Sequence, residues 1–231
     1  QLVHSIPPRW SVVPKNKKRI SLFVFENKEI PSLWIEKLKE CQSVIVPSKF
    51  NYDSLKAAGL ENVHVVNHAV DLKIWNNSIK MPRLNQDRKR IITVGTWRER
   101  KNWKNMALAV IKLIKENVNI EWTLKTDKSN QASEQVKKWL SENGISHLFN
   151  NNIKIDARIL DESSMARLVS SHDILLSGSF GEGFGLPALQ ACFSKLLVVC
   201  PNYGGYREFF DNRTYFEVKA KDFLKINKMD N

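Results

Sequence analysis

The stretch DILLSGSFGEGFGLPALQACFSKLLVVC, residues 173–200, contains the pattern that decides the fold. The apolar run at 173–178 predicts a buried strand, and a glycine-rich loop containing Glu182 follows it. Residues 186–195 then predict a helix, and the apolar run at 196–200 predicts another strand. A strand, a loop, a helix and a strand in this order are typical of an α/β protein with a parallel sheet.

Short apolar runs alternate with helical patterns along most of the chain, which extends this prediction to two sheets. Strands are predicted at 20–26, 43–48, 63–70, 91–96, 120–126 and 152–157, and helices at 30–41, 49–59, 102–116, 133–143 and 161–172. The polar segment 73–89, which contains a proline, interrupts the alternation and predicts a linker. We therefore predict two Rossmann-like parallel-sheet domains, at 1–72 and 90–231.

The composition is typical of a globular protein rather than a membrane-spanning one. Hydrophobic residues make up 42% and charged residues 26% of the 231 residues, and no apolar run approaches the length of a membrane span. The first residues do not form the pattern of a signal peptide. Cys41, Cys192 and Cys200 lack metal-ligand spacing, so we expect buried reduced thiols and a cytoplasmic location.

The formal net charge of +12 predicts an anionic partner. Nucleic acid, an anionic membrane surface and phosphorylated small molecules all fit this charge. The basic residues cluster at 15–19, 88–90, 98–104 and 219–228. None of these clusters is a long arm or an aromatic-interleaved nucleic-acid module, so we expect no specific nucleic-acid partner.

The basic cluster in VGTWRERKN lies where a phosphate could bind. A predicted strand ends at Gly95, and Arg98, Arg100 and Lys101 follow it before a helix that begins near Asn102. The free N–H groups and partial positive charge of a helix N-terminus favour a phosphate. The alternative reading of this segment is a solvated basic turn.

The glycine-rich loop is the second candidate site. Gly183 and Gly185 allow positive φ or a close approach of the backbone to a ligand. The carboxylate of Glu182 suits the hydroxyl groups of a sugar, and Gln190 on the following helix can both donate and accept hydrogen bonds. The alternative is a glycine-rich turn that caps a buried helix, with Glu182 exposed to solvent. A third loop, PNYGGYREFF at 201–210, reads either as a site loop or as a surface turn.

Three of these segments, in this order, resemble the donor-binding domain of retaining glycosyltransferases of the GT-B fold, family 4. They are IITVGTWRERKN (91–102), LDESSMARLVSSHDILLSGSFGEGFGLPALQAC (160–192) and PNYGGYREFF (201–210). The segment at 43–75 resembles the end of the family's N-terminal domain and the crossing to the linker. The resemblance implies transfer of a sugar, with retention, from a nucleotide-diphospho-sugar donor. It implies no metal ion and no cofactor.

The resemblance also implies roles for individual residues. Lys101 and Arg100 would hold the donor diphosphate, and Glu182 would contact the donor sugar, so Glu182 and Lys101 are the expected catalytic residues. Gln190 would contact the nucleotide ribose, and Arg158 lies where the family places the base. The other expected donor-binding residues are Ser179, Gly183, Phe184, Gly185 and Leu186.

The sequence departs from the family pattern in several places. Gln190 stands in place of the second of two paired glutamates, which favours the alternative of a degenerate or truncated nucleotide-sugar-binding module without turnover. Thr96 stands where many members have an arginine. Much of a typical N-terminal half has no counterpart, so we expect a truncated or minimal N-terminal domain.

The part of the family pattern that binds the acceptor, in the N-terminal domain, is less well represented in this sequence. His4 is a candidate acceptor-side histidine or, alternatively, a structural one. We expect a glycan, lipid-linked or protein acceptor. The donor phosphates account for only part of the positive charge, and the rest leads us to expect peripheral contact with an anionic membrane surface.

Overall fold

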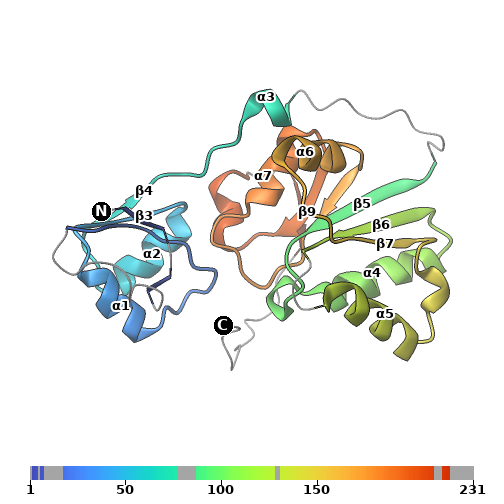
Figure 1. Cartoon of the computed structure of the whole chain (residues 1–231), viewed down its shortest axis with the longest axis horizontal. Helices are drawn as coiled ribbons and strands as arrows, with labels where there is room; N and C mark the ends of the chain where they lie inside the picture. The colour runs from blue at the N-terminus through green and yellow to red at the C-terminus, as the bar shows by residue number, and fades with distance from the viewer. Residues whose placement is uncertain are drawn as a thin grey trace. The chain divides into compact units, whose positions relative to one another are not determined.

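The chain forms two compact units in the computed structural model, and each is described by itself (Figure 1). The structure describes residues 2–4, 6–7, 18–76, 87–127, 131–210 and 215–218. The middle of the predicted linker (77–86), most of the basic cluster at 15–19 and the basic cluster at 219–228 lie outside the described residues. The smaller unit consists of Gln1–Ala69, Gly181–Leu186 and Asn202–Asp211, and the larger unit contains the rest.

The smaller unit is built on four parallel strands in the order β1-β2-β3-β4. Its elements are β1 (Leu2–His4), β2 (Ile20–Leu22), α1 (Ser32–Lys39), β3 (Ser43–Val46), α2 (Lys49–Ala57) and β4 (Val63–Val65). Both helices pack on the same face of the sheet, where Leu38 and Leu55 meet Val44 and Val46 (Figure 1). The strands and helices predicted in this region are confirmed, with shorter strands than expected; β1 was not predicted, because three residues are too few to give a periodic pattern.

Helix α2 is fixed at both ends by local chemistry. Ser48 is its N-cap, and the Ser48 hydroxyl accepts a hydrogen bond from the Asn51 amide at 3.2 Å. At the other end Gly59 has φ +84°, which is the left-handed stop expected from the sequence. The Ser48 hydroxyl also donates to the Gly183 carbonyl at 2.6 Å, so the cap joins α2 to the glycine-rich loop within the smaller unit.

The larger unit is built on six parallel strands in the order β10-β9-β8-β5-β6-β7. The strands are β5 (Lys89–Val94), β6 (Ile120–Lys125), β7 (Ile153–Asp156), β8 (Ile174–Leu176), β9 (Leu197–Pro201) and β10 (Phe216–Val218). The α-helices are α3 (Leu72–Trp75), α4 (Trp103–Lys115), α5 (Ala132–Glu142), α6 (Glu162–Ser170) and α7 (Leu186–Phe193). Short 3-10 helices are η2 (Glu99–Lys101), η4 (Ser146–Leu148) and η5 (Gly204–Glu208), the last of which lies in the smaller unit.

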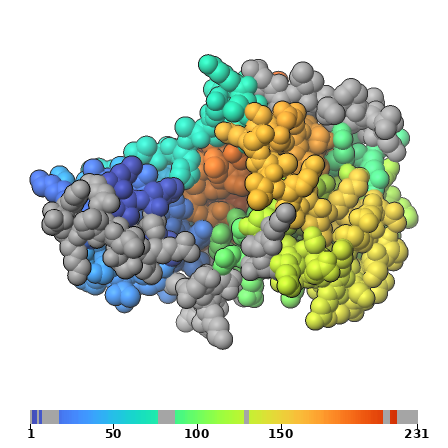
Figure 2. All heavy atoms as spheres, in the orientation of Figure 1, coloured from blue at the N-terminus to red at the C-terminus, as the bar shows by residue number. Residues whose placement is uncertain are grey.

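This strand order is that of a doubly wound α/β sheet. Helices α4 and α5 cover one face of the sheet, and α6 and α7 cover the other (Figure 1). In the space-filling view of Figure 2, α5 and α6 lie at the surface of the larger unit. The direction of winding changes between the neighbouring strands β5 and β8, and ligands of such sheets bind beyond the carboxyl ends of the strands at that point.

Among the strands and α-helices of the larger unit, two short elements were not predicted. Helix α3 overlaps the start of the predicted linker, and it is held in place by Trp75, which is buried and donates from Nε1 to Glu162 Oε1 at 2.9 Å. A single buried tryptophan leaves no periodic signal in the sequence. Strand β10 was also missed, because three residues are too few to show alternation. The predicted domain ranges, 1–72 and 90–231, stay predictions.

The three cysteines are unpaired, as predicted. Cys41 and Cys200 are buried, whereas Cys192 on α7 is half-buried. Burial raises the pKa of the Cys192 thiol to about 11 and that of Cys200 to about 12. Within the described residues, no helix has the length and apolar character needed to cross a bilayer.

Substitution of Ser48 by alanine tests the cap that joins α2 to the glycine-rich loop. The variant loses the bond from the Asn51 amide and leaves the Gly183 carbonyl without its donor. We expect the free energy of unfolding to fall by about 1–2 kcal/mol in urea denaturation. Ser133→Ala is the matched control, because Ser133 lies in the first turn of α5 in the larger unit and makes neither of these two bonds; an equal loss in both variants would contradict the role of the cap.

Candidate functional site

The turn after β5 carries the basic residues expected to hold a diphosphate. Arg100 and Lys101 lie in η2, and Asn102, with φ +56°, separates η2 from α4. A Cβ atom on Gly95 would lie 3.1 Å from Lys101 Cε, so the glycine leaves room for the lysine side chain to cross the strand end. The helix therefore begins one residue later than the expected start near Asn102, after a short 3-10 turn that presents the basic side chains.

Two tryptophans give this turn a rigid base. The Trp97 ring stacks on the Trp103 ring with centroids 5.4 Å apart and planes 23° from parallel. Trp103 is buried, and its Nε1 donates to the Thr96 carbonyl at 2.9 Å. Thr96 thus contributes its backbone at the position where the resemblance led us to look for an arginine side chain.

The turn after β8 is hydrogen-bonded directly to the turn after β5. The Phe180 amide donates to the Arg100 carbonyl at 2.8 Å, and the Ser179 hydroxyl donates to the same oxygen at 3.2 Å. Asn102 Nδ2 donates to the Gly178 carbonyl at 2.9 Å. Strands β5 and β8 are neighbours in the sheet, so these bonds join two turns at the point where the winding reverses.

The glycine-rich loop at Gly181–Leu186 belongs to the smaller unit and is packed against other backbone segments there. The Glu182 carbonyl accepts from the Gly205 amide at 2.8 Å, and the Glu182 side chain is buried. A Cβ atom on Gly183 would lie 2.5 Å from Val24 Cγ1. The expectation that Gly183 admits a ligand is therefore not needed to explain this glycine, and the alternative of an exposed Glu182 is wrong.

Gly185 is the residue of this loop with positive φ, at +89°. A Cβ atom there would lie 2.6 Å from Tyr206 Cδ1, so both backbone strain and lack of space require glycine. The neighbouring Phe184 ring contacts the rings of His68 and Phe209, with centroids 5.0 and 5.2 Å apart. Leu186 is half-buried and begins α7.

The third loop, at 201–210, is held to α2 by Glu208. Its Oε2 accepts from the Lys49 amide at 2.7 Å, and its Oε1 accepts from Asn67 Nδ2 at 2.9 Å. A carboxylate at a helix N-terminus is favoured by the free amides and by the helix dipole. Glu208 therefore serves as an additional cap of α2 within the smaller unit, and the reading of this loop as a plain surface turn is incomplete.

His68 is a residue of this region that the sequence reading did not single out. Burial lowers the pKa of its imidazole, and electrostatic interaction with His4 lowers it further. His4 is in β1 and is exposed. The His68 ring contacts Phe184 of the glycine-rich loop. The signal available in the sequence was a second histidine in a segment read only as a strand.

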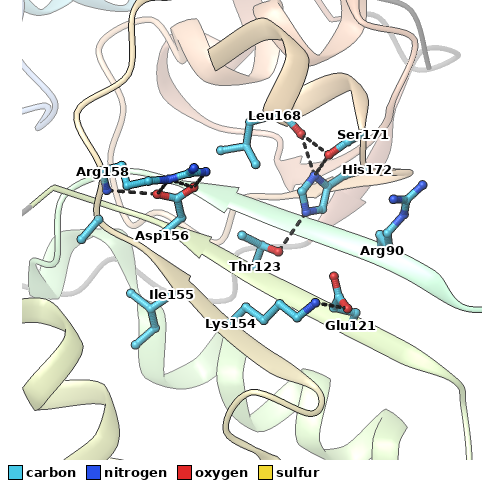
Figure 3. A pocket seen from close by; sticks show the side chains of 11 residues that line it. Arg90, Glu121, Thr123, Lys154, Ile155, Asp156, Arg158, Leu168, Ser171 and His172 are labelled. Atoms are coloured by element: carbon cyan, nitrogen blue, oxygen red, sulfur yellow. Dashed lines mark hydrogen bonds and ion pairs between the residues drawn. The ribbon is translucent and has the colours of Figure 1, made fainter. Parts of the chain in front are cut away.

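Arg158 lies just beyond β7, at one end of a pocket of about 410 Å³ (Figure 3). Its guanidinium pairs with Asp156, with Nη2 2.6 Å from Oδ2, and this contact lowers the pKa of the Asp156 carboxyl. Another ion pair in the pocket joins Lys154 Nζ to Glu121 Oε2 at 2.6 Å. The pocket thus contains one residue of the expected site, and these charged groups are mutually compensated.

His172 forms part of the same pocket but is committed to structural contacts. Its Nε2 lies 2.9 Å from Thr123 Oγ1, and its Nδ1 lies 2.8 Å from the Leu168 carbonyl (Figure 3). The residue is buried, and burial lowers the pKa of the imidazole. Both ring nitrogens have partners, so His172 packs α6 against the sheet and is not a candidate acid or base.

The expected site residues are divided between the two units. The larger unit contains Arg100, Lys101, Arg158, Ser179 and Gln190, and the smaller unit contains His4, Glu182, Gly183, Phe184, Gly185 and Leu186. Within the larger unit the structure joins Ser179 to Arg100, whereas Arg158 lies beyond a different strand. Gln190 is half-buried on α7. The assignment of ligands to these residues stays a prediction.

Solved structures of similar fold include TarM, a glycosyltransferase and an O-GlcNAc transferase. TarM matches with a TM-score of 0.72 and 15% identity over 96% of this chain. A glycosyltransferase from Rickettsia africae ESF-5 matches with a TM-score of 0.72 and 19% identity over 96% of the chain. The pneumococcal O-GlcNAc transferase GtfA, solved with UDP and GlcNAc, matches with a TM-score of 0.65 and 14% identity over 89% of the chain.

These likenesses define the class of fold. The chain spans 45%, 63% and 42% of the three solved chains, in the order given. A search of curated proteins found no match. The parallel sheets and these neighbours together give the chain the α/β fold of the GT-B glycosyltransferases. The family model of the glycosyl transferases group 1 matches residues 76–222, which is more than half of the chain, and the chain belongs to this family.

Substitution of Gly185 by alanine tests how tightly the glycine-rich loop is packed. Gly59→Ala is the matched control, because Gly59 lies in the same unit with a similar φ of +84° and has nothing within 4 Å of an added Cβ. We expect Gly59→Ala to lower the free energy of unfolding by about 1 kcal/mol through backbone strain. Gly185→Ala should cost about 1–3 kcal/mol more because of the clash with Tyr206. Urea denaturation measures both free energies of unfolding. Equal losses in Gly59→Ala and Gly185→Ala would show that the loop moves to accommodate the added Cβ atom and is not tightly packed.

Proposed function

We propose that the chain carries the donor site of a retaining glycosyltransferase of family 4. In this proposal the enzyme moves a sugar from a nucleotide-diphospho-sugar to an acceptor and needs no metal ion. The observation that carries the proposal is the hydrogen-bonded junction of two turns at the point where the larger sheet reverses its winding. There the backbone of Arg100 is bonded to Ser179 and Phe180, and η2 presents Arg100 and Lys101.

The chemistry proposed for this junction is electrostatic. The hydroxyl oxygen of the acceptor forms a bond to the anomeric carbon while the bond from that carbon to the diphosphate breaks, and the hydroxyl proton leaves with the diphosphate. Negative charge therefore develops on the departing nucleoside diphosphate. Arg100 and Lys101 stabilise this charge from a fixed turn, which costs no reorganisation during the reaction. Glu182 holds the hydroxyl groups of the donor sugar through charge-assisted hydrogen bonds.

Two of the comparisons support a nucleotide-sugar donor. The chain belongs to the glycosyl transferases group 1, and a protein of similar fold was solved with UDP and GlcNAc. We further propose a glycan, lipid-linked or protein acceptor and a cytoplasmic location with peripheral contact with an anionic membrane. The net charge of +12 supports the last of these proposals.

Gln190 favours a second candidate function, a module that binds a nucleotide-sugar without turning it over. An amide in place of a carboxylate still bonds to a ribose but loses the charge-assisted contact. This alternative predicts binding of a nucleotide-sugar in calorimetry and no release of nucleoside diphosphate, even when an acceptor is present.

Release of nucleoside diphosphate from UDP-, GDP- and ADP-sugars tests the proposed activity. We expect one of these donors to be turned over, and Lys101→Met to lower kcat/KM for it by about 100- to 1,000-fold, because a positioned charge on the leaving group is lost. Lys104→Met is the control, since Lys104 is an exposed lysine on the first turn of α4 and the change in net charge is the same. Turnover of no donor, or equal losses in the two variants, would contradict the proposal.

The two positions of the expected glutamate pair separate the enzyme from the binding module. We expect Glu182→Gln to lower kcat by about 100-fold or more, because the carboxylate contact with the donor sugar is lost while the shape of the side chain is kept. Gln190→Glu should retain activity within about threefold, since it restores the carboxylate that makes a charge-assisted hydrogen bond to a ribose hydroxyl. The kcat of each variant is measured by steady-state kinetics with whichever of the UDP-, GDP- and ADP-sugars is turned over. Full activity in Glu182→Gln would remove this residue from the mechanism.

A further inference from the structure

Lys125 is a buried lysine at the carboxyl end of β6, with only 8% of the residue exposed. Its ammonium group donates to the Thr126 and Arg158 carbonyls, each at 2.8 Å, and to the Asp156 carbonyl at 3.4 Å. Three donors are thus matched by three backbone acceptors. Burial lowers the pKa of Lys125, while the Asp156 carboxylate raises it. A charged group is tolerated at this depth only because its hydrogen-bond donors are satisfied.

The position of Lys125 explains why these carbonyls need a side-chain donor. Strand β7 is the edge strand of the sheet, so the backbone beyond its carboxyl end has no further strand to bond with. Arg158 lies two residues past that end, and the lysine supplies the donor for its carbonyl oxygen. The neighbouring Thr126 amide donates to the Asp156 carbonyl at 2.9 Å, which ties the same two strand ends together again.

Lys125 also connects this edge with the turn that carries the basic pair. The Gly95 amide donates to the Lys125 carbonyl at 3.0 Å, immediately before the turn containing Arg100 and Lys101. Through its backbone and its side chain, one residue therefore bonds to the ends of β5 and β7. These strands flank β6 on its two sides.

The Arg158 side chain is held in turn by Asp156. Asp156 Oδ1 accepts from the Arg158 amide and from its Nε, both at 3.0 Å, and Oδ2 accepts from Nη2 at 2.6 Å. Figure 3 shows the two side chains lying along each other at the end of the strand. The Arg158 side chain is 70% exposed, so the guanidinium is oriented by Asp156 and still open to a ligand.

We propose that Lys125 is a positioning residue for the nucleotide base of the donor. This inference rests on the proposed function, in which Arg158 lies at the base. The ammonium of Lys125 fixes the backbone of 156–158, and Asp156 fixes the guanidinium on that backbone. Removal of the ammonium releases the Arg158 carbonyl and lets the side chain leave the orientation that the base requires.

The test compares a ligand that has a base with one that has none. UDP, GDP and ADP are titrated calorimetrically into the chain and into Lys125→Met, and inorganic pyrophosphate is titrated in parallel. We expect the affinity for the preferred nucleotide to fall by about tenfold or more in Lys125→Met, and the affinity for pyrophosphate to stay within about twofold. A general loss of structure in the larger unit would instead lower the affinities for nucleotide and for pyrophosphate by the same factor.

Lys154→Met is the matched control. Lys154 is on the adjacent strand, directly opposite Thr123 in the register, and its ammonium pairs with Glu121 rather than with the strand ends. The substitution removes the same charge from the same sheet, so a long-range effect on an anionic ligand appears in both variants. Nucleotide binding should be unchanged within about twofold in Lys154→Met.

A double variant tests whether Lys125 acts through Arg158. We expect Lys125→Met to weaken nucleotide binding by less than about twofold when Arg158→Ala is already present, because both changes remove the same contact. If Lys125→Met does not fold, Lys125→Gln replaces it. Its amide keeps two N–H donors for the carbonyls, so we expect a partial loss of nucleotide affinity, of about threefold or more, with the affinity for pyrophosphate again within about twofold.

The inference is overturned if Lys125→Met binds the nucleotide as the unchanged chain does. It is also overturned by equal losses for nucleotide and pyrophosphate, by an equal loss in Lys154→Met, or by additive losses in the double variant. Absence of nucleotide binding in the unchanged chain would overturn the proposed function and this inference with it. When the unsubstituted protein binds a nucleotide and any of these other outcomes is found, the inference about Lys125 fails and the proposed function stands.

Discussion

The carbonyl oxygen of Arg100 accepts hydrogen bonds from the Phe180 amide and the Ser179 hydroxyl, and the organisation of the larger unit depends on this contact. Where a doubly wound sheet reverses, the helices that follow the two central strands lie on opposite faces. No helix then bridges the turns after β5 and β8, so they must be held by direct bonds to each other. The Arg100 carbonyl supplies such a link, and Arg100 is itself a residue of η2.

Much of this architecture could be predicted from the sequence, because it depends on local patterns. Apolar runs bounded by polar turns identified the longer strands, and Gly59 marked the end of α2 through its left-handed backbone. The glycine-rich loop and the basic turn were found because glycine, lysine and arginine at strand ends are unusual enough to stand out. The roles given to them in catalysis came from the family resemblance and stay predictions.

The rest could not be predicted, because it depends on contacts between residues far apart in the sequence. Ser48 bonds to Gly183 across 135 positions, and no pattern in either segment indicates the other. The buried Trp75 creates α3 in a segment that reads as a linker. Lys125 carried a weak signal, a charged residue at the end of a predicted strand, but its carbonyl partners are visible only in three dimensions.

The glycines of the loop at 181–186 have a consequence for how mutational surveys of this family are interpreted. Added Cβ atoms on Gly183 and Gly185 meet Val24 and Tyr206, which are parts of the protein itself. Invariance of these positions in a selection experiment would therefore measure how closely the loop packs against the rest of its own unit. A loss of activity at a glycine reports a displaced loop, whereas a loss at a side chain such as Lys101 reports on chemistry.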